Sequence, residues 1–328
     1  MTPLGELARR FKRNQAVISR VVAAALRAGV VQFRVVHPEN CPPRRCLDLQ
    51  AELLRKYPDL LSATVASVGP SPTVAPDHEA ALEYSDRVHR LLGLTLAIEI
   101  ARGTLIKNGD QVGIGPGRGV YETIRALRHQ GAVRAGGVTL ISLSGVGYLR
   151  HYSKNRNPLL DPDFMVGSMG EAFEKPVALD LVSAPLVIQP GEARAAPVRR
   201  WLGSDNRNRR AIDTAIMGVG ALIPGNRFYA EGSSSQAATH EPLYNSIRES
   251  LRSLLRLSES FRTPDYTPVG DIGYHLFFVP PPLGAHVPEV SQAVINRQVD
   301  SVNASLLAAH ADDLKAIRSV VLVAGTTA

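Results

Sequence analysis

A glycine-rich turn between a short apolar run and a helical pattern has the residue types best suited to ligand chemistry in this chain. The apolar run is 112–115, the turn is 115–119 (GPGRG), and the helical pattern continues to Arg128. A strand, a glycine turn and a helix start direct backbone N–H groups and the positive end of a helix dipole to one place. The segment therefore predicts a site for an anionic or polyol ligand, with Arg118 as the charged contact for a phosphate.

A second interpretation of the turn is purely structural, because a tight strand-to-helix connection also needs glycine. The spacing G-x-G-x-G differs from the dinucleotide fingerprint. Gly136 and Gly137 stand about 20 residues on, where that fingerprint has an acidic ribose-binding residue. We therefore expect no dinucleotide and no other cofactor at this turn.

Apolar runs alternate with amphipathic stretches along the chain, which predicts an α/β fold with a parallel sheet covered on both faces. Strands are expected at 63–68, 112–115, 138–143, 177–182, 211–218, at one or two places within 269–279, and at 320–324. Helices are expected at 47–57, 82–102, 120–127, 193–202, 243–257 and 305–318, and a long polar excursion at 149–165.

Small residues follow four of the expected strands. They are Gly115, Ser144 with Gly145, Gly218, and Gly325. In open α/β sheets ligands bind outside the carboxyl ends of the strands, so we expect these residues to line one site together with Gly117, Arg118 and Gly119. Asp213 precedes an expected strand, and we expect it to be structural, capping or pairing with backbone groups.

Charge is concentrated at the start of the chain. Residues 1–36 hold seven Lys or Arg residues and one acidic residue, Glu6, a net charge of +6. The whole chain carries +7, which leaves +1 for the remainder. A basic head on a nearly neutral body predicts a polyanion as the partner of the head.

The head has the pattern of a helix-turn-helix. A short helix over 3–11 and a turn at Lys12 and Arg13 precede Asn14, a good N-cap for a second helix that Gly29 ends. The second helix of such a motif enters the major groove of duplex DNA. We expect the DNA contacts to come from Arg13, Asn14, Gln15, Ser19 and Arg20, with Gln15 suited to adenine.

Composition bounds the remaining possibilities. Residues 37–46 are proline-rich and polar, so we expect a head at 1–36, a linker at 37–46 and an α/β domain at 47–328. The only cysteines are Cys41 and Cys46, with His37 the one further ligand close by, so no metal site is expected. No apolar run approaches the roughly 20 residues of a membrane span, and the N-terminus has no apolar signal core, so we expect a cytoplasmic protein without a membrane partner.

Five stretches along the chain resemble, in this order, motifs of the SorC/DeoR-type bacterial transcriptional regulators. Residues 7–35 resemble their helix-turn-helix, 110–120 their effector loop, 211–220 their central A-D-x-A-x-x-G-I-G strand, and 269–277 their G-D-I segment. Residues 295–302 followed by 314–325 resemble their last conserved stretch. The chain departs from the family in having Gly119 where a threonine is usual, no helix before the helix-turn-helix, and no effector-binding lysine after Gly325.

The resemblance implies a small helix-turn-helix joined to a Rossmann-like effector domain of the sugar-phosphate isomerase and deaminase type. It implies that Asp271, in the G-D-I segment, accepts hydrogen bonds from ligand hydroxyls, and that the chain forms a homodimer or homotetramer. The leading hypothesis is a DNA-binding regulator that senses a sugar or sugar phosphate and is not an enzyme. Two alternatives stay open: a sugar-phosphate isomerase or deaminase of the same fold, with Asp271 or Asp213 as its base, and a DNA-binding protein whose pocket is vestigial.

Overall fold

The computed structural model describes most of the chain beyond its N-terminal part. The described ranges are 44–67, 78–130, 133–145, 161–184, 186–188, 212–221, 242–263, 266–282 and 286–325, with Arg9, Arg10, Lys12, Asn14, Ala16, Val17 and Arg20 before them. The chain divides into two compact units, Met1–Cys41 and Pro42–Ala328. The helix expected at 193–202 lies outside the described residues.

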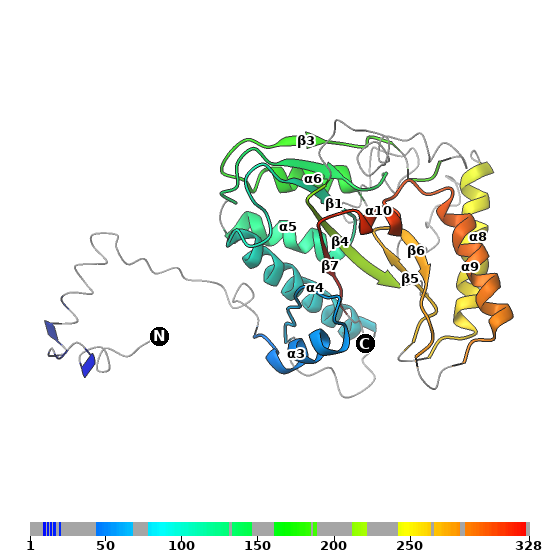
Figure 1. Ribbon diagram of the computed structural model, residues 1–328, viewed down its shortest axis with the longest axis horizontal. Coiled ribbons are helices and arrows are strands. Elements are labelled where there is room, and N and C mark those ends of the chain that lie inside the picture. The colour runs from blue at the N-terminus through cyan, green and yellow to red at the C-terminus, as the bar shows by residue number, and fades with distance from the viewer. Residues whose placement is uncertain are drawn as a thin grey trace. The chain divides into compact units, whose positions relative to one another are not determined.

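A seven-stranded sheet forms the centre of the second unit (Figure 1). Five parallel strands lie in the order β3-β2-β1-β4-β7. They span Ala178–Asp180 (β3), Thr139–Ser142 (β2), Gln111–Ile114 (β1), Thr214–Ala221 (β4) and Ser319–Val323 (β7). Five of the expected strands are thus present, and the predicted parallel arrangement holds for these five.

The region predicted to hold one or two strands at 269–279 forms an antiparallel hairpin, which departs from the fully parallel sheet expected. Its strands are β5 (Val269–Ile272) and β6 (His275–Phe278), and β5 runs antiparallel to the last residues of β4. The reversal takes place at Gly273 and Tyr274, which both have positive φ, 56° and 78°. A two-residue turn of this kind joins neighbouring strands only in the antiparallel sense.

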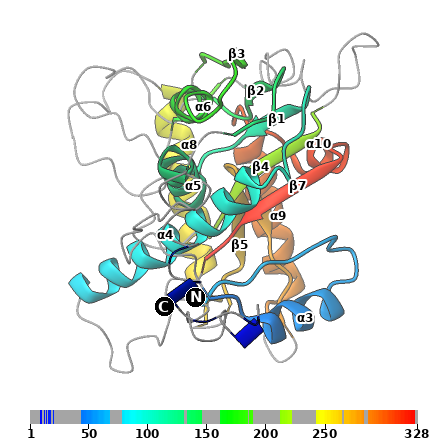
Figure 2. The same cartoon turned by 90° about the vertical axis from the view of Figure 1, so that its left-hand side faces the viewer.

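One face of the parallel strands is covered by three helices, α4 (His78–Ala101), α5 (Arg118–Gln130) and α6 (Pro162–Gly170) (Figure 2). Their apolar stripes form one core with the strands. Fully or almost fully buried members include Ile100, Ile114, Ile124, Leu127, Leu140 and Met165. Helices α4 and α5 cross closely at Gly93, where an added Cβ would lie 2.4 Å from the backbone carbon of Glu122.

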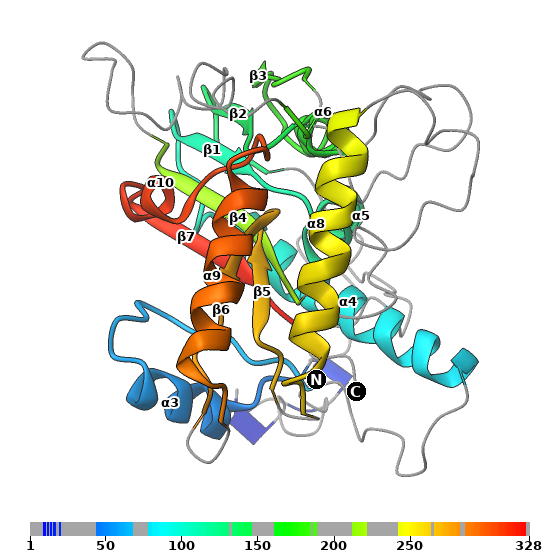
Figure 3. The ribbon, with the colours of Figure 1, turned by 90° about the vertical axis from the view of Figure 1, so that its right-hand side faces the viewer.

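Helices α8 (Pro242–Glu259) and α9 (Glu289–Asn303) lie side by side against the hairpin (Figure 3). The second core here contains Leu254, Leu276 and Val302. Asn303 joins α9 to β6, because its side chain accepts from the N–H of Leu276 at 2.9 Å and donates to the carbonyl of the same residue at 2.8 Å. The hairpin, which pairs with the last residues of β4, is thereby held against α9.

Three sequence expectations are wrong. Of the strand expected at 63–68, the described residues 63–67 form no strand and only a single bridge, between Ala66 and Arg45. Of the polar excursion expected at 149–165, residues 149–160 lie outside the described part of the chain. Its last residues form the start of α6 instead, because Asp161 caps that helix by accepting from the N–H of Phe164. The helix expected at 305–318 is instead an extended segment followed by the short α10 (Ala311–Lys315).

The physical reason for the last error is burial on several sides. Leu306 and Ala308 form bridges with Val187 and Ser144, and residues 305–309 are all buried. These tertiary contacts override the helical propensity of a segment rich in leucine and alanine. The true helix in this region, α9, lies earlier in the chain.

Candidate effector site

The sheet has a topological switch point between β1 and β4. From β1 the chain builds outward to β2 and β3, and then returns to place β4 on the other side of β1. In sheets of this type the crevice at the carboxyl ends of the strands flanking the switch point is where ligands bind. The glycine turn 115–119 lies directly after β1 at this point.

Backbone hydrogen bonds hold the turn against β4. The N–H of Gly115 donates to the carbonyl of Ile216 at 2.9 Å, and the carbonyl of Pro116 accepts from the N–H of Gly218 at 3.3 Å. Gly117, at φ 135°, then opens the first turn of α5, since its carbonyl accepts from the N–H of Tyr121 at 3.0 Å. The expected order of strand, glycine turn and helix is confirmed.

Gly218 is the residue of β4 that is hydrogen-bonded both to the glycine turn and to the hairpin. Its N–H bonds to the turn after β1, while its carbonyl accepts from the N–H of Gly273 in the hairpin at 3.1 Å. A Cβ on Gly218 would lie 2.9 Å from the carbonyl oxygen of Pro116 and 3.1 Å from the Cα of Gly117. Gly218 therefore lies within β4 and not at its end as expected, and its missing side chain admits the turn.

Asp271 lies on the same side of the sheet as the start of α5. It is directly opposite Gly220 in the β4–β5 ladder, and Gly220, Gly218 and Ile216 share the face that carries the α5 core. A Cβ on Gly220 would lie 2.2 Å from the Asp271 Oδ1, so the carboxylate covers this glycine. The structure thus brings Asp271 to the strand that contacts the glycine turn.

The Asp271 carboxylate is poorly compensated. Burial raises its pKa from 3.8 to about 6, and the hydrogen bond from the N–H of Tyr274, at 3.4 Å, lowers the pKa only in part. A carboxylate in this state gains from further hydrogen-bond donors, such as the hydroxyls of a ligand. It also titrates within the range in which a general base works.

The end of β2 adds a buried hydroxyl next to the turn. The N–H of Leu143 donates to the carbonyl of Ile114 at 3.0 Å, so Ser144 and Gly145 follow beside Gly115. Ser144 is fully buried, and its Oγ has no hydrogen-bond partner within the part of the chain that the structure describes. Such a hydroxyl is costly to bury, and a ligand hydroxyl or a water would satisfy it.

Arg118 contacts a partner that the sequence did not indicate. It begins α5, and its guanidinium forms an ion pair with the carboxylate of Asp86 on α4. One turn further along α4, burial lowers the pKa of His89, whose Nδ1 lies 2.7 Å from the carbonyl oxygen of Ser85. An anionic ligand would have to share Arg118 with Asp86.

This pairing leads to a testable difference between two variants. Arg118→Ala is expected to weaken a phosphorylated ligand by about 1 kcal/mol, a value reduced by the partial exposure of the pair. Asp86→Asn is expected to strengthen the same ligand by a similar amount, because it releases the guanidinium. Calorimetry with the phosphorylated and free forms of one sugar measures both effects. Equal changes for the two forms would show that Arg118 does not contact the phosphate.

Two of the predicted site glycines have packing roles. A Cβ on Gly119 would lie 2.5 Å from Cγ1 of Val323, so this glycine lets α5 approach the end of β7. A Cβ on Gly325 would meet Leu92 and Val88 of α4 at 2.7 and 2.9 Å. At both positions the space beside the glycine is filled by side chains of the protein itself.

Asp213 lies at the opposite end of the strands. Its Oδ2 accepts from the N–H of Gln111 at 2.9 Å, and its Oδ1 is 3.3 Å from a guanidinium nitrogen of Arg318. Arg318 also reaches Asp110, with 3.4 Å between nitrogen and oxygen. The expected structural role of Asp213 is confirmed, because it ties the amino ends of β1 and β4 together.

Few of the predicted DNA-binding residues fall within the described part of the head. Arg13, Gln15 and Ser19 lie outside it, while Asn14 and Arg20 are exposed. The side chain of Asn14 accepts from the N–H of Val17 at 2.8 Å, which is the contact of the predicted N-cap. The helix-turn-helix as a whole stays a prediction.

The described residues hold neither a candidate metal site nor a candidate membrane span. Within these ranges no group of three or more His, Cys, Asp or Glu side chains is arranged to hold a metal ion. None of the helices in this part of the chain combines the length and the apolar character of a membrane span.

Comparison with known proteins identifies the fold. No family model matches the chain, and no curated protein matches it significantly. The solved structure of the full-length sorbitol operon regulator SorC from Klebsiella pneumoniae is similar, with a TM-score of 0.52, 16% identity, and coverage of 99% of this chain and 85% of SorC. A structure described as the sugar-binding domain of a transcriptional repressor from Vibrio fischeri matches with a TM-score of 0.52, 14% identity, and coverage of 84% and 85% of the two chains. The chain therefore shares the fold of these bacterial regulators.

Proposed function

We propose that this chain is a DNA-binding transcriptional regulator whose α/β unit binds a sugar or a sugar phosphate. The observation that supports the proposal is the switch point between β1 and β4, where the glycine turn is hydrogen-bonded to β4. Ser144 follows the neighbouring strand β2, and Asp271 lies opposite Gly220 of β4. The fold shared with SorC and the basic head of net charge +6 support the same function.

The polar groups at this point fit a polyol. Asp271 offers a carboxylate that accepts hydrogen bonds from hydroxyls, and Ser144 offers a hydroxyl that can donate or accept. The first turn of α5 has N–H groups without intrahelical acceptors and the positive end of the helix dipole, which suits a phosphate. The ligand expected here is a sugar with or without one phosphate.

A thermal-shift screen tests the effector half of the proposal. Sugars are assayed in pairs, each free and phosphorylated, because a ligand that binds only the folded state raises the melting temperature. A hit should lose its effect in Asp271→Ala and keep it in an Asp213→Ala variant altered at the other end of the strands. A full panel without a shift would favour the vestigial pocket.

The raised pKa of Asp271 bears on the alternative of a sugar-phosphate isomerase or deaminase. Such an enzyme needs a carboxylate base near C1 and C2 of its substrate. We expect binding without turnover, and incubation of each hit with the protein followed by sugar analysis measures this. Conversion that disappears in Asp271→Asn would replace the regulator by the enzyme.

The head is expected to bind duplex DNA mainly through charge. Affinity should fall steeply between about 50 and 200 mM salt, because each neutralised phosphate releases counterions. Arg20→Ala should weaken binding to all sequences, and Gln15→Ala should relax the preference at one base step by roughly 1–3 kcal/mol. Fluorescence anisotropy with selected and random duplexes measures both. Salt-insensitive binding, or binding unchanged after removal of residues 1–36, would contradict the assignment.

A further inference from the structure

Exposed apolar side chains gather on and just after helix α3 (Leu47–Lys56). The described part of the chain contains twelve large hydrophobic residues with exposed side chains, and six of them lie within 47–61. They are Leu47, Leu49, Leu53, Tyr57, Leu60 and Leu61, with exposures from 37% to 90%. No residue of α3 is buried. The helix therefore presents an apolar surface that the rest of the described chain does not cover.

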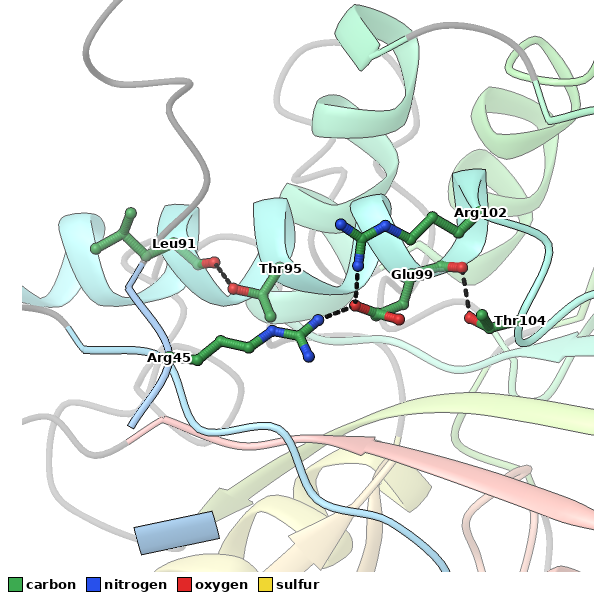
Figure 4. A network of polar contacts seen from close by, with 6 residues as sticks. All are labelled: Arg45, Leu91, Thr95, Glu99, Arg102 and Thr104. Atoms are coloured by element: carbon green, nitrogen blue, oxygen red, sulfur yellow. Dashed lines mark hydrogen bonds and ion pairs between the residues drawn. The ribbon is translucent and has the colours of Figure 1, made fainter. Parts of the chain in front are cut away.

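The segment that carries α3 is nevertheless attached firmly at its base. Cys46 N–H donates to the carbonyl of Val65 at 2.9 Å, and Ser67 N–H donates to that of Arg44 at 2.7 Å, so the two ends of the excursion pair antiparallel. The guanidinium of Arg45 forms an ion pair with Glu99 of α4 (Figure 4).

Glu99, whose carboxylate pairs with Arg45, makes two further contacts that hold it in place. Arg102 lies 3.1 Å from the same oxygen of Glu99, and the hydroxyl of Thr104 donates to the backbone carbonyl of Glu99 at 2.7 Å (Figure 4). The base of the excursion is thus fixed to α4 while its apolar face stays open, which is the arrangement of a docking element.

Two parallel rows of side chains define this face. Leu49, Leu53 and Tyr57 follow one another at four-residue spacing, which places them along one stripe of the helix. The adjacent row holds Asp48, Glu52 and Lys56 at the same spacing, and all three are exposed. The row is acidic at the start of the helix and basic at its end.

We propose that this surface, α3 with Leu60 and Leu61, binds the same surface of a second copy of the chain, with the two α3 helices antiparallel. A two-fold axis near Leu53 packs Leu53 on its equivalent and Leu49 on Tyr57 of the second copy. It also sets Asp48 and Glu52 beside the basic end of the other helix. A parallel pair would place like charges together, so the charge pattern selects the antiparallel arrangement.

The pairing goes beyond the proposed function and does not depend on it. It concerns a helix that begins at Leu47, and five residues separate that helix from the end of the first unit at Cys41. A dimer formed through α3 would link two heads through these five residues of each chain. Symmetric pairs of heads are the usual requirement for reading two half-sites of DNA.

Sedimentation velocity of the full chain over a range of concentrations tests the interface. The double variant Leu49→Glu with Leu53→Glu should halve the assembly size or raise the dissociation constant about 100-fold or more. The reason is that a negatively charged side chain replaces each of two apolar contacts. The control is Leu179→Glu with Leu181→Glu, which adds the same charges at leucines of similar exposure, 46% and 42%. Circular dichroism verifies the fold of both variants. An unchanged assembly, or equal effects of the two double variants, would overturn the proposal.

Charge exchange and cross-linking identify the occupant and its direction. Lys56→Glu should weaken the assembly, and Glu52→Lys combined with it should restore it. In a background with Cys41→Ser and Cys46→Ser, diamide should join chains through Leu53→Cys at least about tenfold faster than through Leu61→Cys. Leu61 is the more exposed position, at 90%, so accessibility alone predicts the reverse order. Slower cross-linking through Leu53→Cys than through Leu61→Cys would overturn the proposed antiparallel pairing.

Discussion

Replacement of Asp271 by asparagine is expected to stabilise the protein at pH 8 while weakening its effector about 10–100-fold. Burial raises the pKa of Asp271 from 3.8 to about 6, so the folded protein binds this proton more tightly than the unfolded chain. The carboxyl group therefore contributes stability that is complete below about pH 4 and is lost as the pH rises through 6. The two pKa values correspond to a loss of about 3 kcal/mol at most.

Asparagine keeps the shape of the side chain and an oxygen for the N–H of Tyr274, but it removes the charge. The gain in the free energy of unfolding should therefore be near zero at pH 4 and about 1–3 kcal/mol at pH 8. The loss of effector affinity follows because hydrogen bonds to a charged acceptor are worth about 1.5–3 kcal/mol. Urea unfolding at several pH values and calorimetry with a hit from the screen measure the two effects.

Asp213→Asn is the matched control at the other end of the sheet. Its carboxylate is paired with Arg318 and the N–H of Gln111, so the change should destabilise the protein and leave effector binding intact. If Asp271→Asn lost stability at pH 8 to the same degree as Asp213→Asn, Asp271 would be a structural acceptor and the effector site would lie elsewhere.

Gly218→Ala is expected to destabilise the protein by about 1–3 kcal/mol or more and to abolish effector binding. The added methyl group would lie 2.9 Å from the carbonyl oxygen of Pro116, which belongs to the backbone and cannot turn aside as a side chain can. The glycine turn would have to move off β4, and the start of α5 would move with it. Urea unfolding and the thermal-shift response to a hit measure both consequences.

Gly167→Ala provides the control of opposite sign. Gly167 lies within α6 and an added Cβ would meet nothing within 4 Å, so alanine should stabilise the helix by about 0.5–1 kcal/mol. Equal stability of the Gly218→Ala variant and the wild type would mean that the turn is loosely held. A bulkier Gly117→Val would not separate ligand contact from the packing of the turn. Gly117 has φ 135°, and a Cβ added to it would lie 3.1 Å from the Cα of Gly218, so we expect that variant to disturb the turn.

Much of the parallel part of the fold was predictable from local patterns. The periodicity of 82–102 and the turn 115–119 required no knowledge of the partners, because a buried helix stripe and a strand-to-helix corner are specified by neighbouring residues. The same holds for Asp213, whose place before an apolar strand indicated a structural acceptor.

The roles of the glycines were decided by tertiary contacts. Sequence can show that a side chain is absent, but not what occupies the vacant space. At Gly218 the occupant is the turn, at Gly220 it is Asp271, and at Gly119 it is Val323. The pairing of Arg118 with Asp86, 32 residues earlier, is equally invisible in a one-dimensional pattern.

The basic head, the succession of strands and helices in the parallel part of the fold and the strand–turn–helix corner can all be inferred from the sequence, since each depends on composition or short-range periodicity. The antiparallel hairpin, the extended segment at 306–310 and the exposed face of α3 became visible only in the folded chain. Each of these depends on which distant residues bury a given side chain, and burial by distant residues outweighs the roughly 0.5 kcal/mol per residue of local propensity.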